Sequence, residues 1–194
     1  MGSLPADQSG GPPIGPYCRV PIVVRAADPR APEVARRVIA LIAAKRPGAI
    51  AEHVGSSAVP GLAGKGTIDL LLPAPPGEIP AIVEDLLELG FQRQAIAFPP
   101  FPPNRPMLQG VLPHDDTSFR IHVHVVPASS PDVASMRGFR DALLADPALR
   151  AEYAALKEAI VAGGAVDSVA FSKAKHDYIV ATLHRLGLPT GELV

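Results

Sequence analysis

Residues 67–72 read TIDLLL, an apolar β-strand pattern that contains a single carboxylate, Asp69. Side chains on a strand alternate between its two faces, so Thr67, Asp69 and Leu71 share one face and purely apolar residues share the other. An unpaired charge buried in such a strand costs on the order of several kcal/mol. The fold must therefore supply Asp69 with a partner, a proton or a metal. The simplest alternative is a structural carboxylate that accepts hydrogen bonds from backbone N–H groups.

A second strand pattern, FRIHVHVV at 119–126, carries two imidazoles on one face. Arg120, His122 and His124 point one way, while the apolar residues between them are expected to face the core. Two histidines at i and i+2 on a strand lie roughly 6.5–7 Å apart at Cα, so their rings can converge on one ion. If the two strands are neighbours, Asp69 joins the histidines as a ligand set for a divalent metal. Two half-buried histidines bonded to carbonyl groups are the alternative.

The turn VGSSAVPG at 54–61 has the composition of an anion-binding turn. Gly55 lets the backbone come close to a ligand. The hydroxyl groups of Ser56 and Ser57 can donate to phosphate, and successive N–H groups in such a turn form an anion nest. Lys65 adds a point charge nearby in the sequence. An ordinary capped turn with Lys65 in solvent is the alternative.

The order of strand and helix patterns indicates an α+β fold with a mixed, mostly antiparallel sheet and a helical C-terminal third. Strands are expected at 19–26, 48–54, 67–72, 91–97, 107–112 and 118–126, the last two as a β-hairpin. Helices are expected at 29–48 and 79–90, after the caps Ser130-Pro131 and Asp146-Pro147, and at 168–186.

Two proline-rich or glycine-rich stretches are interpreted as irregular. Prolines cannot pair centrally in a sheet, so 99–106 is interpreted as a rigid surface loop. Residues 1–17 are rich in glycine, proline and serine and are interpreted as a flexible tail. A single domain is expected at 18–190.

Composition narrows the classes of protein to which the chain can belong. Its 194 residues carry 18 lysines and arginines against 19 aspartates and glutamates, a net charge of −1. General nucleic-acid binding requires a basic surplus and is not expected, whereas a small anionic substrate held by a few cations is. Cys18 is the only cysteine, which excludes an intramolecular disulfide and a thiolate zinc cluster. Without a signal-peptide pattern or a long apolar run, we expect a cytoplasmic protein that makes no membrane contact. Its oligomeric state stays open.

The segment EHVGSSAVPGLAGKGTIDLLL, at 52–72, resembles the signature of the GrpB-like family, a branch of the nucleotidyltransferase superfamily. The stretches RIHVHVV, FRDALLADPALRAEYAALK and FSKAKHDYI resemble further motifs of that family in the same order. The likeness covers about residues 20–186. It implies a nucleotidyltransferase-like mixed sheet with the Gly-Ser turn at its edge and flanking helices.

The resemblance also implies roles. In nucleotidyltransferases the Gly-Ser turn holds a nucleoside triphosphate, and carboxylates on neighbouring strands bind Mg²⁺. Asp69 fills the first carboxylate position, whereas Leu71 stands at the second and the imidazoles of RIHVHVV stand where a third is expected. One carboxylate with two imidazoles suits Zn²⁺, Mn²⁺, Fe²⁺ or Ni²⁺ better than Mg²⁺, so the divalent metal is not fixed among Mg, Mn and Zn.

Together these features predict a metal-dependent, nucleotidyltransferase-like enzyme that acts on a nucleotide or a phosphorylated small molecule. The expected catalytic residues are Asp69, His122, His124 and Lys175, the last reaching the site from helix 168–186. The residues expected to bind the cofactor are Gly55, Ser56, Ser57, Lys65 and Arg120. Two alternatives stay open: the same fold repurposed for other chemistry on a small polar metabolite, and a non-catalytic nucleotide-binding module.

Overall fold

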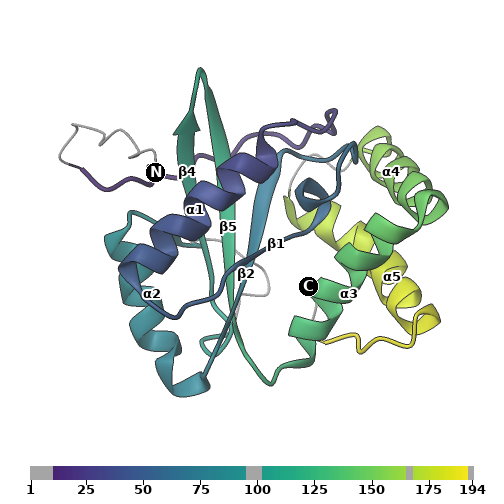
Figure 1. Cartoon of the computed structure of the whole chain (residues 1–194). Helices are drawn as coiled ribbons and strands as arrows, with labels where there is room; N and C mark the ends of the chain where they lie inside the picture. The colour runs from purple at the N-terminus through teal and green to yellow at the C-terminus, as the bar shows by residue number, and fades with distance from the viewer. Residues whose placement is uncertain (1–10, 95–101, 165–167, 192–194) are drawn as a thin grey trace.

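A single sheet forms the centre of the computed structural model, which describes residues 11–94, 102–164 and 168–191 (Figure 1). Within these residues the strands lie in the order β1-β2-β5-β4-β3. Strands β2 and β5 are parallel, and the other neighbouring pairs are antiparallel. This arrangement confirms the predicted α+β class with a mixed, mostly antiparallel sheet. The strand bounds are β1 Glu52–Val54, β2 Thr67–Ala74, β3 Gln92–Arg93, β4 Met107–His114 and β5 Thr117–Pro127.

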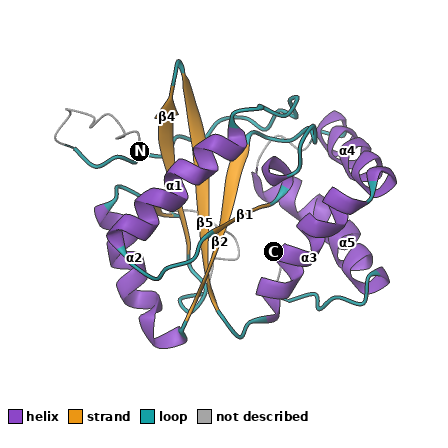
Figure 2. Ribbon diagram, in the orientation of Figure 1, coloured by secondary structure: helices purple, strands orange, loops and turns teal. Residues whose placement is uncertain are grey.

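Helices α1, Ala31–Lys45, and α2, Ile79–Glu88, cover one face of the sheet (Figure 2). The apolar alternate positions of β2 and β5 pack against them, among them Leu70, Ile121 and Val123, all fully buried. Burying such a side chain contributes about 1.5–3 kcal/mol. A slip of one residue would turn these side chains away from the core, so their burial fixes the register of β2 on β5.

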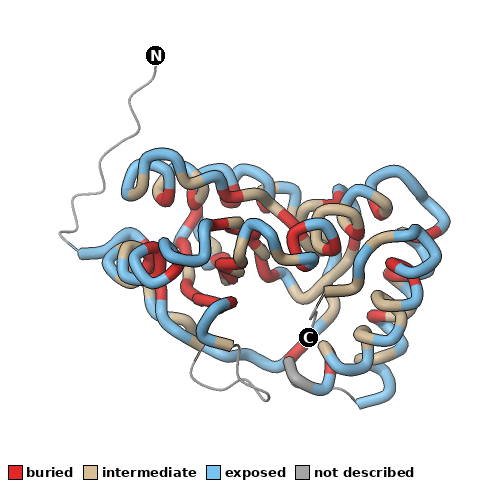
Figure 3. The backbone as a smooth tube through the Cα atoms, turned by 90° about the horizontal axis from the view of Figure 1, so that it is seen from below, coloured by how far each residue is buried: buried red, intermediate tan, exposed pale blue. Residues whose placement is uncertain are grey.

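The opposite face of the sheet carries the C-terminal helices α3, Pro131–Ala145, α4, Pro147–Ala162, and α5, Ser168–Arg185 (Figure 2). Leu71 and Val126 pack on Val133 of α3, which anchors that helix to the sheet. Buried residues recur at intervals along the helices, with exposed residues between them, as expected for amphipathic helices (Figure 3). No helix within the described ranges combines the length and apolar character needed to cross a bilayer.

The predicted helix starts at Ser130 and Asp146 are confirmed by their caps. The Ser130 side chain accepts a hydrogen bond from the N–H of Asp132, 3.2 Å away. The Asp146 carboxylate accepts from the N–H groups of Ala148 and Leu149. Each helix then continues with a proline at its first position, where the missing N–H costs nothing.

Three predicted strands were wrong in whole or in part, and the one expected at 48–54 is shortened to β1. Residues 19–26 form no strand, and their one ladder-type contact is a bridge between Arg25 and Gly64. Several of these residues are exposed, so the apolar pattern there does not mark a core element. Within the predicted strand 91–97, the structure has β3, and positions 95–97 lie outside the described residues.

The stretch 99–106 is a surface loop only in part. Positions 99–101 lie outside the described residues, but Arg105 is buried and donates a hydrogen bond to the equally buried Asp132 at the start of α3. Likewise, residues 1–10 of the predicted tail are not described, whereas the adjoining segment packs on the sheet. Ile14 of that segment is 1% exposed and belongs to the main core.

Candidate functional site

The pairing of β2 with β5 brings Asp69, His122 and His124 together, as the two sequence patterns predict. Asp69 is the register partner of His122, and Leu71 is the partner of His124. The Oδ1 atom of Asp69 lies 3.3 Å from Nδ1 of His122 and 3.6 Å from Nε2 of His124. One ligand atom from each of the three lies within 4.8 Å of the others, a grouping able to hold a metal ion. The face opposite the core thus carries a compact donor set.

The electrostatics of this cluster keep the carboxylate ionised. Burial on its own would raise the pKa of Asp69, but hydrogen bonds with both histidines and the charge of Lys65 hold that pKa well below its ordinary value. Burial lowers the pKa of His122, although Asp69 acts in the opposite sense. An ionised carboxylate beside a neutral imidazole is the protonation state in which both groups bind metal.

The Gly-Ser turn lies directly against Asp69. Gly55 has φ 72°, and a Cβ at this position would lie 2.9 Å from Oδ2 of Asp69. Any other residue would therefore push the turn away from the carboxylate. The short helix η1, Ser56–Ala58, follows at once. The Oγ atom of Ser57 is 3.0 Å from Nε2 of His53 in β1.

Lys157, on α4, is a site residue that sequence reasoning missed. Its side chain is 1% exposed, and its Nζ donates to Oγ of Ser56, 3.2 Å away, and to the carbonyl of Ala63. The same ammonium lies 4.7 Å from the centre of the Tyr153 ring. Burial, reinforced by the charge of Lys175, lowers the pKa of Lys157 to about 7. The available signal was its spacing of four residues from Tyr153, which puts a lysine on the apolar face of the helix.

Lys65 and Lys175 add further positive charge at the same place. Burial lowers the pKa of Lys65 to about 8, with Asp69 opposing the shift and the charges of Lys175 and Arg120 adding to it. Burial also lowers the pKa of Lys175, again opposed by Asp69. Arg120 donates to the carbonyl of Lys65 and so holds the loop that carries it. The charges of Lys65, Lys175 and Asp69 therefore act on one another, and Arg120 contacts the backbone of Lys65.

Comparison with known proteins identifies the family to which the chain belongs. The family model described as GrpB protein matches residues 21–185. The chain belongs to the GrpB family. A relative in that family, UPF0157 protein PA4798 of Pseudomonas aeruginosa, is 36% identical over 177 residues, which are 84% of this chain and 67% of that protein. The resemblance read from the motifs is therefore confirmed.

Solved structures show the fold that the GrpB chain shares. The crystal structure of the conserved protein GrpB from Enterococcus faecalis has a TM-score of 0.67 and 18% identity, covering 84% of this chain and 96% of that chain. Terminal uridylyl transferase 4 from Trypanosoma brucei, solved with bound dUTP, has a TM-score of 0.55 and 14% identity, covering 84% of this chain and 56% of that chain. At such identities the likeness shows a nucleotidyltransferase-like fold.

Two of the carboxylate positions expected of nucleotidyltransferases carry other residues in this GrpB chain. Leu71, at the second carboxylate position, is fully buried and packs with Val54, Val126 and Val133. It offers no ligand atom, and its burial stabilises the contact between the sheet and α3. His122 and His124 are the nitrogen donors that face Asp69 instead.

Proposed function

We propose that this protein is a metal-dependent, nucleotidyltransferase-like enzyme that acts on a nucleotide or a phosphorylated small molecule. The observation that carries the proposal is the position of the Asp69, His122 and His124 cluster, against a glycine-serine turn and near one buried lysine, Lys157, and two half-buried lysines, Lys65 and Lys175. A metal-ligand set and an anion-binding set in contact are what the transfer of a phosphorylated group requires.

The donor set supports a divalent metal. Asp69 supplies a carboxylate oxygen, and His122 and His124 supply one imidazole nitrogen each, with the donor atoms already mutually close. One oxygen and two nitrogens favour Zn²⁺, Mn²⁺ or Fe²⁺ over Mg²⁺, which prefers oxygen ligands. When bound, such a cation supplies positive charge to phosphate oxygens.

The basic residues support an anionic substrate. Burial lowers the pKa values of Lys65, Lys157 and Lys175, and the charge of Asp69 opposes this shift for Lys65 and Lys175. A phosphate group would restore the balance of charge. Lys157 donates to Ser56, which also shares a side-chain hydrogen bond with Tyr153, so the lysine is held beside the serine of the turn and would add its charge there.

Nucleotidyl transfer fits this arrangement. An acceptor oxygen forms a bond to the α-phosphorus of a nucleoside triphosphate, the bond from that phosphorus to the bridging oxygen breaks, and pyrophosphate leaves with the electron pair. The proton of the acceptor hydroxyl passes to solvent or to a nearby base. In this proposal the lysines offset the negative charge of the triphosphate and Ser56 contacts its phosphate groups. The backbone of Gly55 keeps the triphosphate close to Asp69.

A second candidate function is supported by Leu71. Because the second carboxylate of the usual metal site is an apolar core residue here, the same fold would serve other chemistry on a small polar metabolite. In that case Asp69 with the two imidazoles acts as an acid-base or metal set without a triphosphate.

Titration calorimetry with Zn²⁺, Mn²⁺ and Mg²⁺, followed by thermal-shift measurements with the four ribonucleoside triphosphates, tests the proposal. We expect Zn²⁺ or Mn²⁺ to bind more tightly than Mg²⁺ and a triphosphate to raise Tm further in the presence of metal. Release of pyrophosphate from an α-labelled triphosphate then reports turnover. Metal binding without any triphosphate effect would favour the second candidate. Triphosphate binding without turnover would indicate a non-catalytic nucleotide-binding module. If the protein bound neither metal nor triphosphate, the proposal would be overturned.

A further inference from the structure

The segment before the family match, residues 14–17, is fixed to the edge of the sheet. The backbone groups of Gly15 and Val111 exchange both hydrogen bonds, at 2.8 and 3.0 Å. The N–H of Ile14 donates to the carbonyl of Leu89 at 3.1 Å. This short stretch therefore continues the sheet beside β4 and has a defined position.

The chain makes room for this segment at the end of α2. Gly90 has φ 100°, and a Cβ there would lie 2.0 Å from the carbonyl oxygen of Ile14. No other residue is compatible with so close an approach. The Ile14 side chain belongs to the main core, where a Cβ at Gly110 would lie 2.3 Å from its Cγ2 atom, so the segment and the domain are matched to each other.

Tyr17 projects from this segment to the metal-ligand cluster. Its N–H donates to Oε1 of Gln92 at 3.1 Å, which fixes the backbone at the tyrosine itself. Its Oη lies 3.3 Å from Nε2 of His122, and the two ring centres are 5.5 Å apart. His122 is thus held from both sides, by Tyr17 at Nε2 and by Asp69 at Nδ1.

We propose that Tyr17 is a positioning residue for His122, a role that rests on the proposed function because it presents that imidazole to the metal site. An imidazole that binds metal through one nitrogen donates the N–H of its other nitrogen, and the partner that accepts this bond fixes the orientation of the ring. A phenol oxygen both donates and accepts, so Tyr17 keeps its bond to His122 whether or not Nδ1 carries a proton.

The surroundings of Tyr17 keep it a neutral phenol. Burial raises its pKa, an effect that Asp69 reinforces and that Arg120 and Arg19 oppose. Tyr17 lies outside the stretch 21–185 that the family model matches. The inferred role therefore belongs to the N-terminal segment of this chain and adds a partner to His122 that the family motifs do not contain.

The variant Tyr17→Phe tests this role, because it removes the hydroxyl and keeps the ring. The matched control is Tyr178→Phe, which removes a hydroxyl that donates to Glu152 at 3.1 Å, between α5 and α4. With Co²⁺ alone as the probe, we expect Tyr17→Phe to weaken binding by about 10–100-fold, the usual effect of losing such a partner, and to shift the visible absorption of the bound ion. Tyr178→Phe should match the wild type in both measurements.

A second measurement separates this role from the proposed function. In metal-free protein, the side-chain ¹⁵N resonances of His122 should shift in Tyr17→Phe and stay unchanged in Tyr178→Phe. If wild-type protein binds no metal but this shift occurs, the metal proposal fails and the positioning role stands. If the His122 resonances in Tyr17→Phe match those of the wild type, the positioning role is overturned, whatever happens to metal affinity.

Discussion

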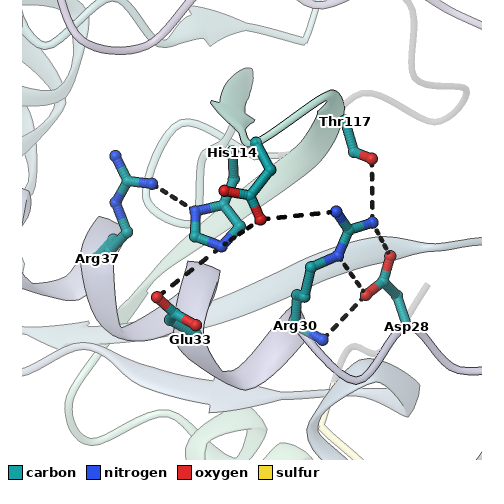
Figure 4. A network of polar contacts seen from close by, with 7 residues as sticks. Asp28, Arg30, Glu33, Arg37, His114 and Thr117 are labelled. Carbon is teal, nitrogen blue, oxygen red and sulfur yellow. Dashed lines mark hydrogen bonds and ion pairs between the residues drawn. The ribbon is translucent and has the colours of Figure 1, made fainter.

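Two buried histidines in this protein sit in opposite kinds of surroundings. His114, at the end of β4, and His122, in β5, are each 8% exposed. Around His114 lies a network at the tip of the hairpin, in which Arg37 contacts the imidazole and Glu33 lies 3.9 Å from its other nitrogen (Figure 4). Around His122 lie Asp69, Tyr17 and the charge of Lys65.

The difference is one of charge balance. In the hairpin network, Arg30 donates to both carboxylate oxygens of Asp28, at 3.0 and 2.8 Å, and to Thr117 (Figure 4). The hydrogen bond to Asp28 raises the pKa of Arg30, so this cation is stabilised where it lies. At the site, by contrast, the pKa values of Lys65 and Lys157 are lowered. Pairing within the network stabilises the fold, whereas burial at the site disfavours the charged form of its lysines, and this contrast is the basis for proposing that an anion binds there.

The largest effect is expected when one carboxylate is removed from each of the two regions in turn. Asp69→Asn keeps the shape of the side chain but removes the charge that both histidines contact, so we expect Zn²⁺ affinity to fall by at least about 100-fold and any transfer activity to be lost. Asp28→Asn should instead lower the free energy of unfolding by about 0.2–1 kcal/mol, because a partly exposed pair with Arg30 is weak.

Titration calorimetry and urea unfolding of both variants distinguish the two regions. Zn²⁺ affinity in Asp28→Asn should equal that of the wild type. Equal losses of Zn²⁺ affinity in the two variants would show that the effect is general destabilisation, and the contrast between the regions would be wrong.

The sequence predicted the parts of the site that lie on regular strands. Alternation along 67–72 and 119–126 was enough to put Asp69 on a shared face with His122 and His124, because burial of the apolar positions permits only that orientation. The turn at Gly55 could also be predicted, because its signal is a short run of glycine and serine in the sequence. The family motifs then supplied the strand pairing.

The parts that sequence reasoning missed depend on long-range contacts. Lys157 reaches Ser56 across 101 positions of sequence, and Tyr17 reaches His122 across 105. Tyr17 belongs to no local pattern that demands a partner, and the place of Lys157 on the apolar face of α4 does not tell which residue it contacts. The strand predicted at 19–26 failed for the converse reason: an apolar run was present, but only Arg25 finds a bridging neighbour among the described residues.

The next prediction uses the pH dependence of Lys157. Because its pKa is lowered to about 7, the amine is charged below that pH and neutral above it. Affinity for inorganic triphosphate should therefore fall as pH rises from 6 to 8.5, and Lys157→Met should bind about tenfold more weakly at pH 6, as expected for a lost charge-assisted hydrogen bond worth ~1.5 kcal/mol. The difference between variant and wild type should shrink at pH 8.5.

The contribution of Lys157 to the free energy of unfolding should change with pH in the direction opposite to that of triphosphate affinity. Between pH 7 and the ordinary lysine value of 10.5, the unfolded chain holds a proton on this amine that the folded chain has lost. Stability contributed by this group therefore rises with pH over that window. Lys45→Met, which removes a lysine paired with Glu88 on the far side of the sheet, is the matched control. If the triphosphate affinity of Lys157→Met had the same pH profile as that of the wild type, the prediction that Lys157 causes this pH dependence would be wrong.

The smallest expected effect compares two hydroxyl groups. Ser57→Ala removes the contact with His53, and Thr117→Val removes the hydrogen bond from Arg30, at 3.0 Å in each case. Each change should lower the free energy of unfolding by about 0.5–1.5 kcal/mol, the usual net value of one hydrogen bond. Burial lowers the pKa of His53 to about 4, so its ring is neutral at pH 7 and adds no charge to the turn.

Only the serine should affect binding, because Ser57 lies in the turn proposed to bind the anion and Thr117 lies in the charge-balanced network. We expect triphosphate affinity to fall about three- to fivefold in Ser57→Ala, which corresponds to ~0.7–1 kcal/mol, and to stay unchanged in Thr117→Val. Calorimetric titration at pH 7 with matched buffers resolves a change of this size. Unchanged affinity in Ser57→Ala would restrict anion binding to Ser56 and the lysines, and reduced affinity in Thr117→Val would show that the hairpin network and the site are coupled.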